Sequence, residues 1–298
     1  MTYLQFNKGN IQDSIKVSNL MNGKVVKPPI SEQIVISNYL DKKVSQIDTI
    51  ISKQKTLIEK YKVYKQSLIT ETVTKGLNKD VPMKDSGIEY LGYIPHNWTV
   101  KRLRFMGTVQ NGISKSSEQF GFGYPFVSYG DVYKNEVIPK TVEGLINSST
   151  QDRENYSVKE GDVFFTRTSE TIEEVGIAST CLSSIECATF AGFIIRFRPI
   201  TNELNKNFSK YYFRSEIHRK FFVKEMNLVT RASLSQELLK RLPILIPSVE
   251  EQQQIADFLD KKCNAIDSII SKKEQLIEKL ESYKKSLIYE CVTGKREV

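Results

Sequence analysis

A 47-residue segment occurs twice in this chain, at residues 28–74 and again at residues 247–293, with a constant offset of 219 positions. About 26 of the aligned positions are identical, whereas unrelated segments would share only a few. The repeat divides the chain into two similar arms with one large segment between them. Any fold of this chain must therefore accommodate two copies of one element.

Each copy predicts one long helix. Pro29 and Pro247 precede a Glu-Gln pair, and proline followed by acidic residues suits the first turn of a helix. Apolar residues then recur at spacings of three and four, without proline or glycine, to the end of each copy. A helix of about 40 residues is roughly 60–65 Å long. A generic coiled coil would show the same pattern, but two similar copies in one chain favour pairing with each other.

A further row of apolar residues widens the stripe on both predicted helices. It indicates a seam for one partner helix and an apolar flank for something else. The flank consists of Ile50, Leu57, Tyr64, Ile269, Leu276 and Tyr283.

The segment between the copies predicts a separate globular domain. Residues 77–86 are a linker rich in turn-forming residues, and residues 83–246 alternate short β-prone runs with two helical patterns. The fold class is therefore α+β (mixed α/β), with one globular domain and two long helices. The expected strands are Val100–Phe105, Tyr124–Val127, Asp162–Arg167 and Phe193–Phe197, and the expected helices lie near Phe208–Val223 and Leu234–Leu242.

The composition and motifs argue against an enzyme. A net charge of +8 favours a polyanionic partner. The sequence has no GxxxxGK[ST] phosphate loop and no Asn-Pro-Pro-aromatic tetrad. His96 and His218 lack metal-ligand spacing to the cysteines, and Asp41 and Asp260, which mimic part of a nuclease motif, fit solvated helix charges better. We expect neither catalytic residues nor a metal site.

Nothing in the sequence indicates export or a membrane. It has no run of 18 apolar residues and no signal peptide at its first residues. The four cysteines fit reduced thiols in a cytoplasmic protein. They are Cys181, Cys187, Cys263 and Cys291.

Three parts of the globular domain are candidates for nucleic-acid contact. Residues 196–241 hold 11 Lys and Arg against 4 Asp and Glu, interleaved with aromatics. These aromatics could equally form the core face of a helix, with the cations on its solvent-exposed face. The turns after the strands near residues 165 and 127 carry small hydroxyls, which suit phosphates and base edges. The predicted DNA-binding residues are Ser128, Tyr129, Arg167, Thr168, Ser169, Arg196, Arg198, Arg214, Lys220, Arg231 and Ser233.

Taken together, the segments resemble the specificity subunit of type I restriction–modification systems (HsdS). The resemblance rests on P-x-x-x-EQ followed by LDKK, ID-x-IISK, LIEK, YK-x-SLI and VT in both copies. It rests also on the linker VTKGLNKDVPMKDSGIEYLGYIPHNWTVKRL and on GDVFFTRTSETIEEVGIA. It covers nearly the whole chain.

The resemblance implies an antiparallel coiled coil that separates two target recognition domains, each reading one half of a bipartite DNA sequence. This chain would be a reader and scaffold without catalytic residues. Its partners would be double-stranded DNA, the methylation subunit (HsdM) and the motor-nuclease subunit (HsdR). S-adenosylmethionine, ATP and Mg would belong to those partner subunits, and the apolar flank would dock partner helices.

The resemblance also implies a domain order with one departure from the family. Residues 28–76 and 247–298 would be the conserved helical arms, and residues 83–246 the target recognition domain. Residues 1–27 align with the end of that domain and would be the remnant of another. With one recognition domain, the chain could pair with itself, pair with another short subunit or be a non-functional fragment, of which we favour the first two. It could also be a scaffold that binds the methylation subunit without reading DNA.

Overall fold

The computed structural model describes residues 21, 23, 25–169, 174–225 and 232–298. It divides into two compact units, one made of residues up to Glu59 together with Ile269–Val298, and the other of Lys60–Ser268. No helix in the described part is long and apolar enough to cross a membrane.

The two repeats form the two long helices that the sequence predicts. Helix α2 spans Ile30–Lys75 and helix α8 spans Val249–Val292. Gly76 follows α2 with a positive φ of 76°, a conformation that glycine adopts without steric cost, and its N–H donates to the carbonyl of Thr72. The end of the first helix is therefore set by a local glycine signal.

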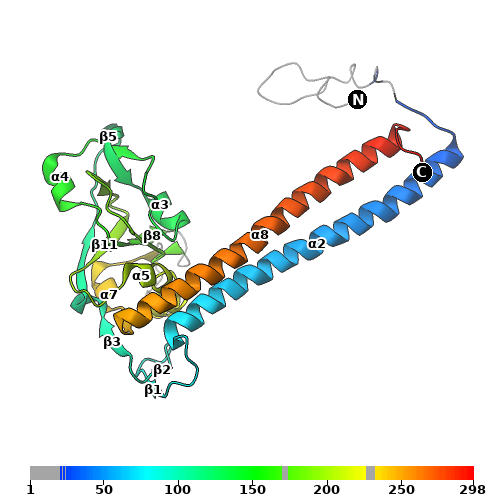
Figure 1. Cartoon of the computed structure of the whole chain (residues 1–298). Coiled ribbons are helices and arrows are strands. Elements are labelled where there is room, and N and C mark those ends of the chain that lie inside the picture. Colours follow the sequence, from blue (N-terminus) through cyan, green and yellow to red (C-terminus); the bar gives the residue numbers. More distant parts are fainter. Residues whose placement is uncertain (1–20, 22, 24, 170–173, 226–231) are drawn as a thin grey trace. The chain divides into compact units, whose positions relative to one another are not determined.

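In the first unit, α2 and α8 run antiparallel, side by side (Figure 1). Lys284 Nζ lies 2.6 Å from Asp48 Oδ1, and Lys273 Nζ donates to Gln54 Oε1 over 2.9 Å. Lys273 and Gln54 are themselves 219 positions apart, so equivalent residues of the two repeats meet. The buried seam between the helices comprises Ile47, Ile51, Ile58, Ile277, Leu287 and Cys291.

In the second unit, Lys65 and Asp267 form the same ion pair as Lys284 and Asp48, from which they lie 219 positions away. Lys65 Nζ lies 2.7 Å from Asp267 Oδ2, and the carboxylate of Glu136 in the globular domain lies 3.9 Å from the same nitrogen. Burial lowers the pKa of Lys65, but the hydrogen bond to Asp267 and the charge of Glu136 outweigh it and raise that pKa overall. This lysine therefore joins both helices and the globular domain.

The globular domain, residues 83–246, is built around a four-stranded antiparallel sheet in the order β4-β11-β7-β9. Phe165 and Phe197, which belong to this sheet, are fully buried. A second, three-stranded sheet has the order β10-β5-β6. The strands are β1 Met83–Asp85, β2 Tyr93–Pro95, β3 Thr99–Arg102, β4 Gly107–Asn111, β5 Phe120–Val127, β6 Leu145–Ile146, β7 Val163–Thr166, β8 Thr168–Ser169, β9 Ala178–Thr180, β10 Thr189–Phe190, β11 Ile194–Pro199, β12 Ala232–Ser233 and β13 Pro243–Ile246.

Short helices surround these strands. The single helix predicted near Phe208–Val223 is two helices, because the chain turns between Phe213 and Glu216, where the Ser215 hydroxyl donates to the carbonyl of Tyr212 and competes with helical bonding. The short helices are α3 Tyr129–Lys134, α4 Thr150–Asn155, α5 Lys206–Tyr212, α6 Ile217–Glu225 and α7 Gln236–Arg241.

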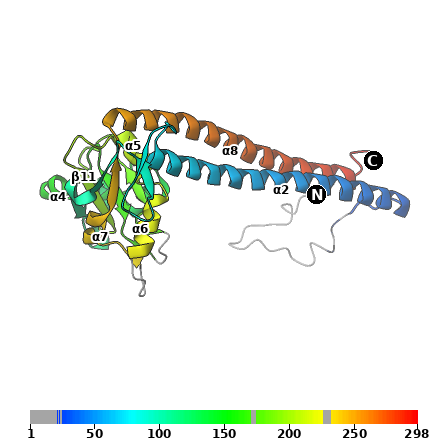
Figure 2. The same cartoon turned by 90° about the horizontal axis from the view of Figure 1, so that it is seen from below.

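The globular domain is seated on the first turns of α8, and Figure 2 shows α5 beside them. Lys210 Nζ and the Tyr211 hydroxyl each lie 2.5 Å from Asp260 Oδ1. Trp98 Nε1 donates to Glu251 over 3.0 Å, and Gln252 is completely buried. We call this surface the α8 seat, made by β13, the first turns of α8 and the last turns of α2.

Candidate nucleic-acid interface

One end of the four-stranded sheet brings several predicted site residues together. Thr166 at the end of β7 pairs with Ile194 at the start of β11, so the segments beyond them meet. The N–H of Arg167 donates to the carbonyl of Phe193 over 2.9 Å. Strand β8 pairs with β12, with Thr168 opposite Ser233. Arg167, Thr168 and Ser233 therefore share one end of the domain, which we call the sheet-end cluster.

Glycines allow the backbones at this end to approach closely. The N–H of Gly192 donates to the carbonyl of Ile113 over 2.9 Å. A Cβ on Gly112 would lie 2.2 Å from the carbonyl oxygens of Phe190 and Ala191, so no larger residue fits there. This packing holds the neighbouring Phe193 in the open, with 67% of its surface exposed.

Phe193 belongs to the sheet-end cluster, although the sequence indicated only a strand beginning there. An aromatic side chain on the surface beside an arginine is suited to contact with bases or with a thymine methyl group. The signal available in the sequence was Gly192 directly before an aromatic at a strand start. That signal is too common to distinguish an exposed ring from a buried one.

The guanidinium of Arg167 keeps hydrogen-bond donors that could contact a ligand. Its guanidinium is partly buried, and Nη1 lies 3.4 Å from the carbonyl oxygen of Gly192, a long hydrogen bond. A guanidinium carries five N–H donors, and the one hydrogen bond that Arg167 makes with its side chain among the described residues leaves most of them for a phosphate or a guanine edge. Arg231, another predicted DNA contact, lies outside the described residues.

Ser128 and Tyr129 have local structural roles. Ser128 caps the first turn of α3: it accepts from the N–H of Asp131 and donates to that carboxylate over 2.6 Å. The ring of Tyr129 stacks on that of Tyr133, with centroids 6.0 Å apart. These contacts explain both residues without a ligand.

Two predicted DNA-contacting arginines, Arg196 and Arg198, bind groups of the domain itself, and the structure does not support their prediction. Arg196 is buried and donates to the carbonyl of Ser157 over 2.7 Å. Burial and the neighbouring Arg198 lower the pKa of Arg196 to about 10, so it stays charged at neutral pH. Arg198 forms a two-point ion pair with the buried Asp162, at 2.7 and 2.6 Å. The contacts of both arginines therefore link separate segments of the domain to one another.

Arg214 is likewise engaged inside the domain. Its Nη1 donates to the carbonyls of Asn135 and Ala178, and its Nη2 donates to the carbonyl of Tyr133, all within 2.9 Å. Burial lowers its pKa. The prediction of a DNA contact is unsupported here too, because these bonds tie the end of α3 to the sheet.

The aromatics interleaved with these cations are core residues. On α6, Phe221 and Phe222 are buried whereas Lys220 is exposed, so Lys220 remains available to DNA. His218 packs between the rings of Tyr212 and Phe213. Burial lowers its pKa to about 3, so it is uncharged at neutral pH. The described residues contain no group of His, Cys, Asp and Glu that could hold a metal ion.

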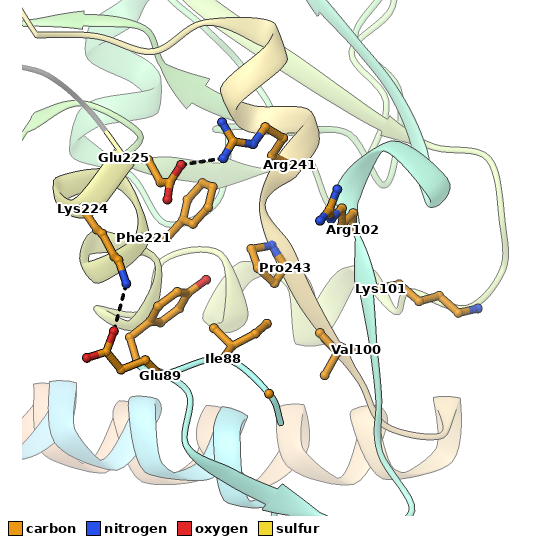
Figure 3. Close-up of a pocket in the computed structure, with 12 residues that line it drawn as sticks. Ile88, Glu89, Val100, Lys101, Arg102, Phe221, Lys224, Glu225, Arg241 and Pro243 are labelled. Atoms are coloured by element: carbon orange, nitrogen blue, oxygen red, sulfur yellow. Dashed lines mark hydrogen bonds and ion pairs between the residues drawn. The ribbon is translucent and has the colours of Figure 1, made fainter. Parts of the chain in front are cut away.

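A depression of about 520 Å³ lies between β3, β13 and α6. Figure 3 shows Lys224 directed to Glu89 and Arg241 directed to Glu225. These two ion pairs neutralise four of the charges that line the depression, whereas Arg102, which also lines it, is exposed.

Comparison with known proteins decides the family. The family model for the type I restriction modification DNA specificity domain matches residues 95–279. The chain belongs to this specificity family. The match takes in most of the globular domain and the first two-thirds of α8.

Two relatives place the chain within the specificity family. The specificity subunit of the type I restriction enzyme MjaVIII from Methanocaldococcus jannaschii is 27% identical over 282 residues, covering 93% of this chain and 63% of the relative. The specificity subunit of the Escherichia coli K12 enzyme EcoKI is 21% identical over 276 residues, covering 90% and 56%. The chain therefore spans about three-fifths of the length of these curated relatives.

Solved structures share the fold. A chain from work on complex assembly and conformational transition of the type I R-M system gives a TM-score of 0.73 at 16% identity, covering 97% of this chain and 67% of that one. The HsdS subunit from Thermoanaerobacter tengcongensis gives 0.55 at 15% identity, covering 98% and 66%. These likenesses confirm the predicted α+β class, with its globular domain and long helices.

The helices of this specificity-family chain carry the second predicted surface. In the first unit Ile50, Leu57, Ile269, Leu276 and Tyr283 all expose more than a third of their surface. In the second unit Tyr64 is exposed as well. The structure thus leaves all six predicted docking residues available to a partner.

Proposed function

We propose that this chain reads one half of a bipartite double-stranded DNA sequence for a type I restriction–modification complex, and that it contributes no catalytic residues. The observation that carries the proposal is the sheet-end cluster, where Arg167, Thr168 and Ser233 meet beside the exposed ring of Phe193. This cluster lies on a domain of the specificity family. The names of the relatives, all specificity subunits, support the same role.

Each member of the cluster has chemistry that DNA recognition uses. The guanidinium of Arg167 can bind a phosphate or the paired acceptors of a guanine. The hydroxyls of Thr168 and Ser233 can donate to or accept from phosphates and base edges. The ring of Phe193 can pack on a thymine methyl group. Lys220, Ser169 and Arg231 remain proposed contacts on the same domain.

We also propose that the exposed apolar residues of the helices dock the methylation subunit, and that a motor-nuclease subunit joins the complex. S-adenosylmethionine, ATP and Mg would act on those subunits. Leu57 and Leu276 are the best placed to test this docking, because each stands on a helix whose opposite face is already buried in the helix pair. We propose that a second half subunit or another copy of the chain reads the other half-site.

The test is a comparison of variants in a gel shift with the methylation subunit present. The target is first identified by mapping methylated adenines in a genome that carries the system. Arg167→Ala is expected to weaken binding to that duplex by about 1–3 kcal/mol, roughly 5- to 150-fold, because it loses a charged contact. Phe193→Ala should weaken binding to the target duplex more than binding to a random duplex.

Lys140→Ala is the matched control, since it removes an exposed cation of the same domain away from the cluster. It should bind like the parent chain. If Arg167→Ala and Phe193→Ala bind both duplexes as the parent does, the sheet-end cluster is not the reading surface.

A second function is favoured by the contacts that three predicted cations make within the domain. Because Arg196, Arg198 and Arg214 bind the domain itself, the chain could act as a scaffold for the methylation subunit without reading DNA. A stable complex with that subunit, combined with no shift of any duplex, would establish this role.

A further inference from the structure

The depression between β3, β13 and α6 is lined by one cation whose charge is not compensated. Arg102, the last residue of β3, is exposed, and its guanidinium makes no hydrogen bond or ion pair among the described residues. Successive residues of a strand point to opposite faces. Figure 3 shows the ammonium group of the preceding Lys101 directed away from the depression, and this group pairs with Glu203. Arg102 therefore brings a free positive charge to the depression.

Arg241 brings a second guanidinium to the same part of the depression. Strand β13 pairs with β3 so that Pro243, two residues after Arg241, lies opposite Arg102. The guanidinium of Arg241 lies 2.7 Å from the carboxylate of Glu225, and both side chains are partly exposed. An ion pair near the surface contributes little to stability, so an anion held by Arg102 can share Arg241 with Glu225. Two guanidinium groups suit an oxyanion, because each can offer it two parallel N–H donors.

A buried hydroxyl without a partner also lines the depression. It belongs to Tyr90, and it makes no hydrogen bond within the described part of the chain. Burial, together with the charge of Glu225, raises the pKa of Tyr90, so its hydroxyl stays protonated at neutral pH. A buried donor that remains unpaired costs free energy. An oxyanion in the depression would give this donor an acceptor.

Two helices connect the depression to the surface that is proposed to read DNA. The N–H of Leu234, just before α7, donates to the carbonyl of Arg167 over 2.7 Å, and α7 ends at Arg241. A helix of this length rises about 9 Å. Phosphates follow one another about every 3.4 Å along each DNA strand, so about three nucleotides span this distance. On α6, Lys220 and Lys224 lie on one face, because they are four residues apart, and Lys224 lines the depression.

We propose that Arg102 and Arg241 bind a phosphate group of the DNA backbone in this depression, beside the bases that the sheet-end cluster contacts. The inference rests on the proposed reading of DNA and adds a contact that positions the duplex on the domain. Because every nucleotide carries the same phosphate, this contact holds any sequence equally well. The net charge of +8 agrees with a polyanionic partner.

The test measures the affinity for the target duplex and for a random duplex at several salt concentrations, with the methylation subunit present. One phosphate contact contributes about 0.9 to the slope of log affinity against log salt, so Arg102→Gln should lower that slope by about 0.9 for both duplexes. Since such a contact vanishes near 1 M salt, the variant should bind both duplexes about fifteenfold more weakly at 50 mM salt and about fourfold more weakly at 200 mM salt.

Two further variants show whether the site or the net charge is responsible. Arg102→Lys should keep the salt slope of the parent chain, because an ammonium group also binds phosphate as a point charge. Arg104→Gln is the matched control, since Arg104 is an exposed arginine two residues further along that does not line the depression. It removes the same charge and should bind both duplexes nearly as the parent does.

An unchanged slope in Arg102→Gln overturns the proposal. An equal change in Arg104→Gln also overturns it, because the effect would then follow net charge alone. A loss of affinity confined to the target duplex overturns it as well, since Arg102 would then read a base.

A second measurement distinguishes the DNA backbone from a free phosphate. Thermal unfolding of the chain without DNA is compared in sodium phosphate and in sodium chloride at equal ionic strength. If phosphate stabilises the parent chain but not Arg102→Gln, and the salt slopes of the two are the same, the depression takes a small phosphate and the proposal fails. If the parent chain binds no duplex, this proposal and the reading of DNA fail together, whereas unchanged binding by Arg102→Gln leaves the reading of DNA intact.

Discussion

The α8 seat and the surface formed by residues 25–41 and the last turn of α8, which we call the α2 seat, are made of similar residues and differ in burial. The α8 seat buries Ile244, Leu259 and Gln252 under the globular domain, whereas Val25, Leu40 and Gln33 on the α2 seat remain wholly or partly open. Helix sequence is therefore insufficient to determine burial. On the α8 seat, contact with the globular domain is what buries these apolar residues.

The middle of the helix pair behaves differently. The ion pairs Lys65–Asp267 and Lys284–Asp48 have nearly the same length, 2.7 and 2.6 Å, in the two units. Equivalent residues thus reach equivalent partners wherever helix meets helix. Burial of the seat residues depends on a third element, the globular domain. The contacts in the seam between α2 and α8 need only the two helices.

The largest contrast between the seats is expected from leucine truncation. Leu259→Ala should cost about 2–5 kcal/mol in the free energy of unfolding, because it leaves a cavity in the packed core. Leu40→Ala should cost about 1 kcal/mol or less, because that side chain is only partly buried. Urea unfolding followed by far-UV circular dichroism and by Trp98 fluorescence measures both. Equal losses would mean that the α2 seat is covered in solution.

A smaller contrast is expected for the two glutamines. Gln252→Ala leaves the carbonyl of Glu203 and the N–H of Asn205 without their partner, at a cost of about 1–3 kcal/mol. Gln33→Ala removes one exposed bond and should change stability by less than about 0.5 kcal/mol. The same urea titrations measure the free energy of unfolding of both variants. A loss at Gln33 as large as that at Gln252 would contradict the seat comparison.

The smallest effects are expected in the helix pair. Lys284→Met should cost about 0.2–1 kcal/mol, because it breaks one ion pair near the surface. Lys65→Met should cost slightly more, since Lys65 also faces Glu136. The difference between the two variants, measured by thermal unfolding at low and high salt, should shrink as salt rises. A difference that persists in high salt would point to packing rather than charge.

The candidate site was only partly predictable. Arg167, Thr168 and Ser233 were expected from small hydroxyls and an arginine near strand ends, and the structure brings them together. Arg196 and Arg214 were expected for the same cationic character, yet their guanidinium groups bind carbonyls of the domain itself. A sequence reports that a cation is present but not which acceptor reaches it. Phe193 was missed because its exposure depends on the close approach of Gly192 to Ile113.

The sequence by itself determined the two helices, their ends and their pairing, because these follow from local periodicity, glycine signals and a repeat that recurs at one offset. It also determined the family, through motifs spread over nearly the whole chain. Only the tertiary structure decided which arginines bind the domain itself and which residues of α8 the globular domain covers. Those outcomes depend on contacts between residues far apart in the chain, such as Asn205 with Gln252, whose free energy exists only after the domain has folded onto the helix.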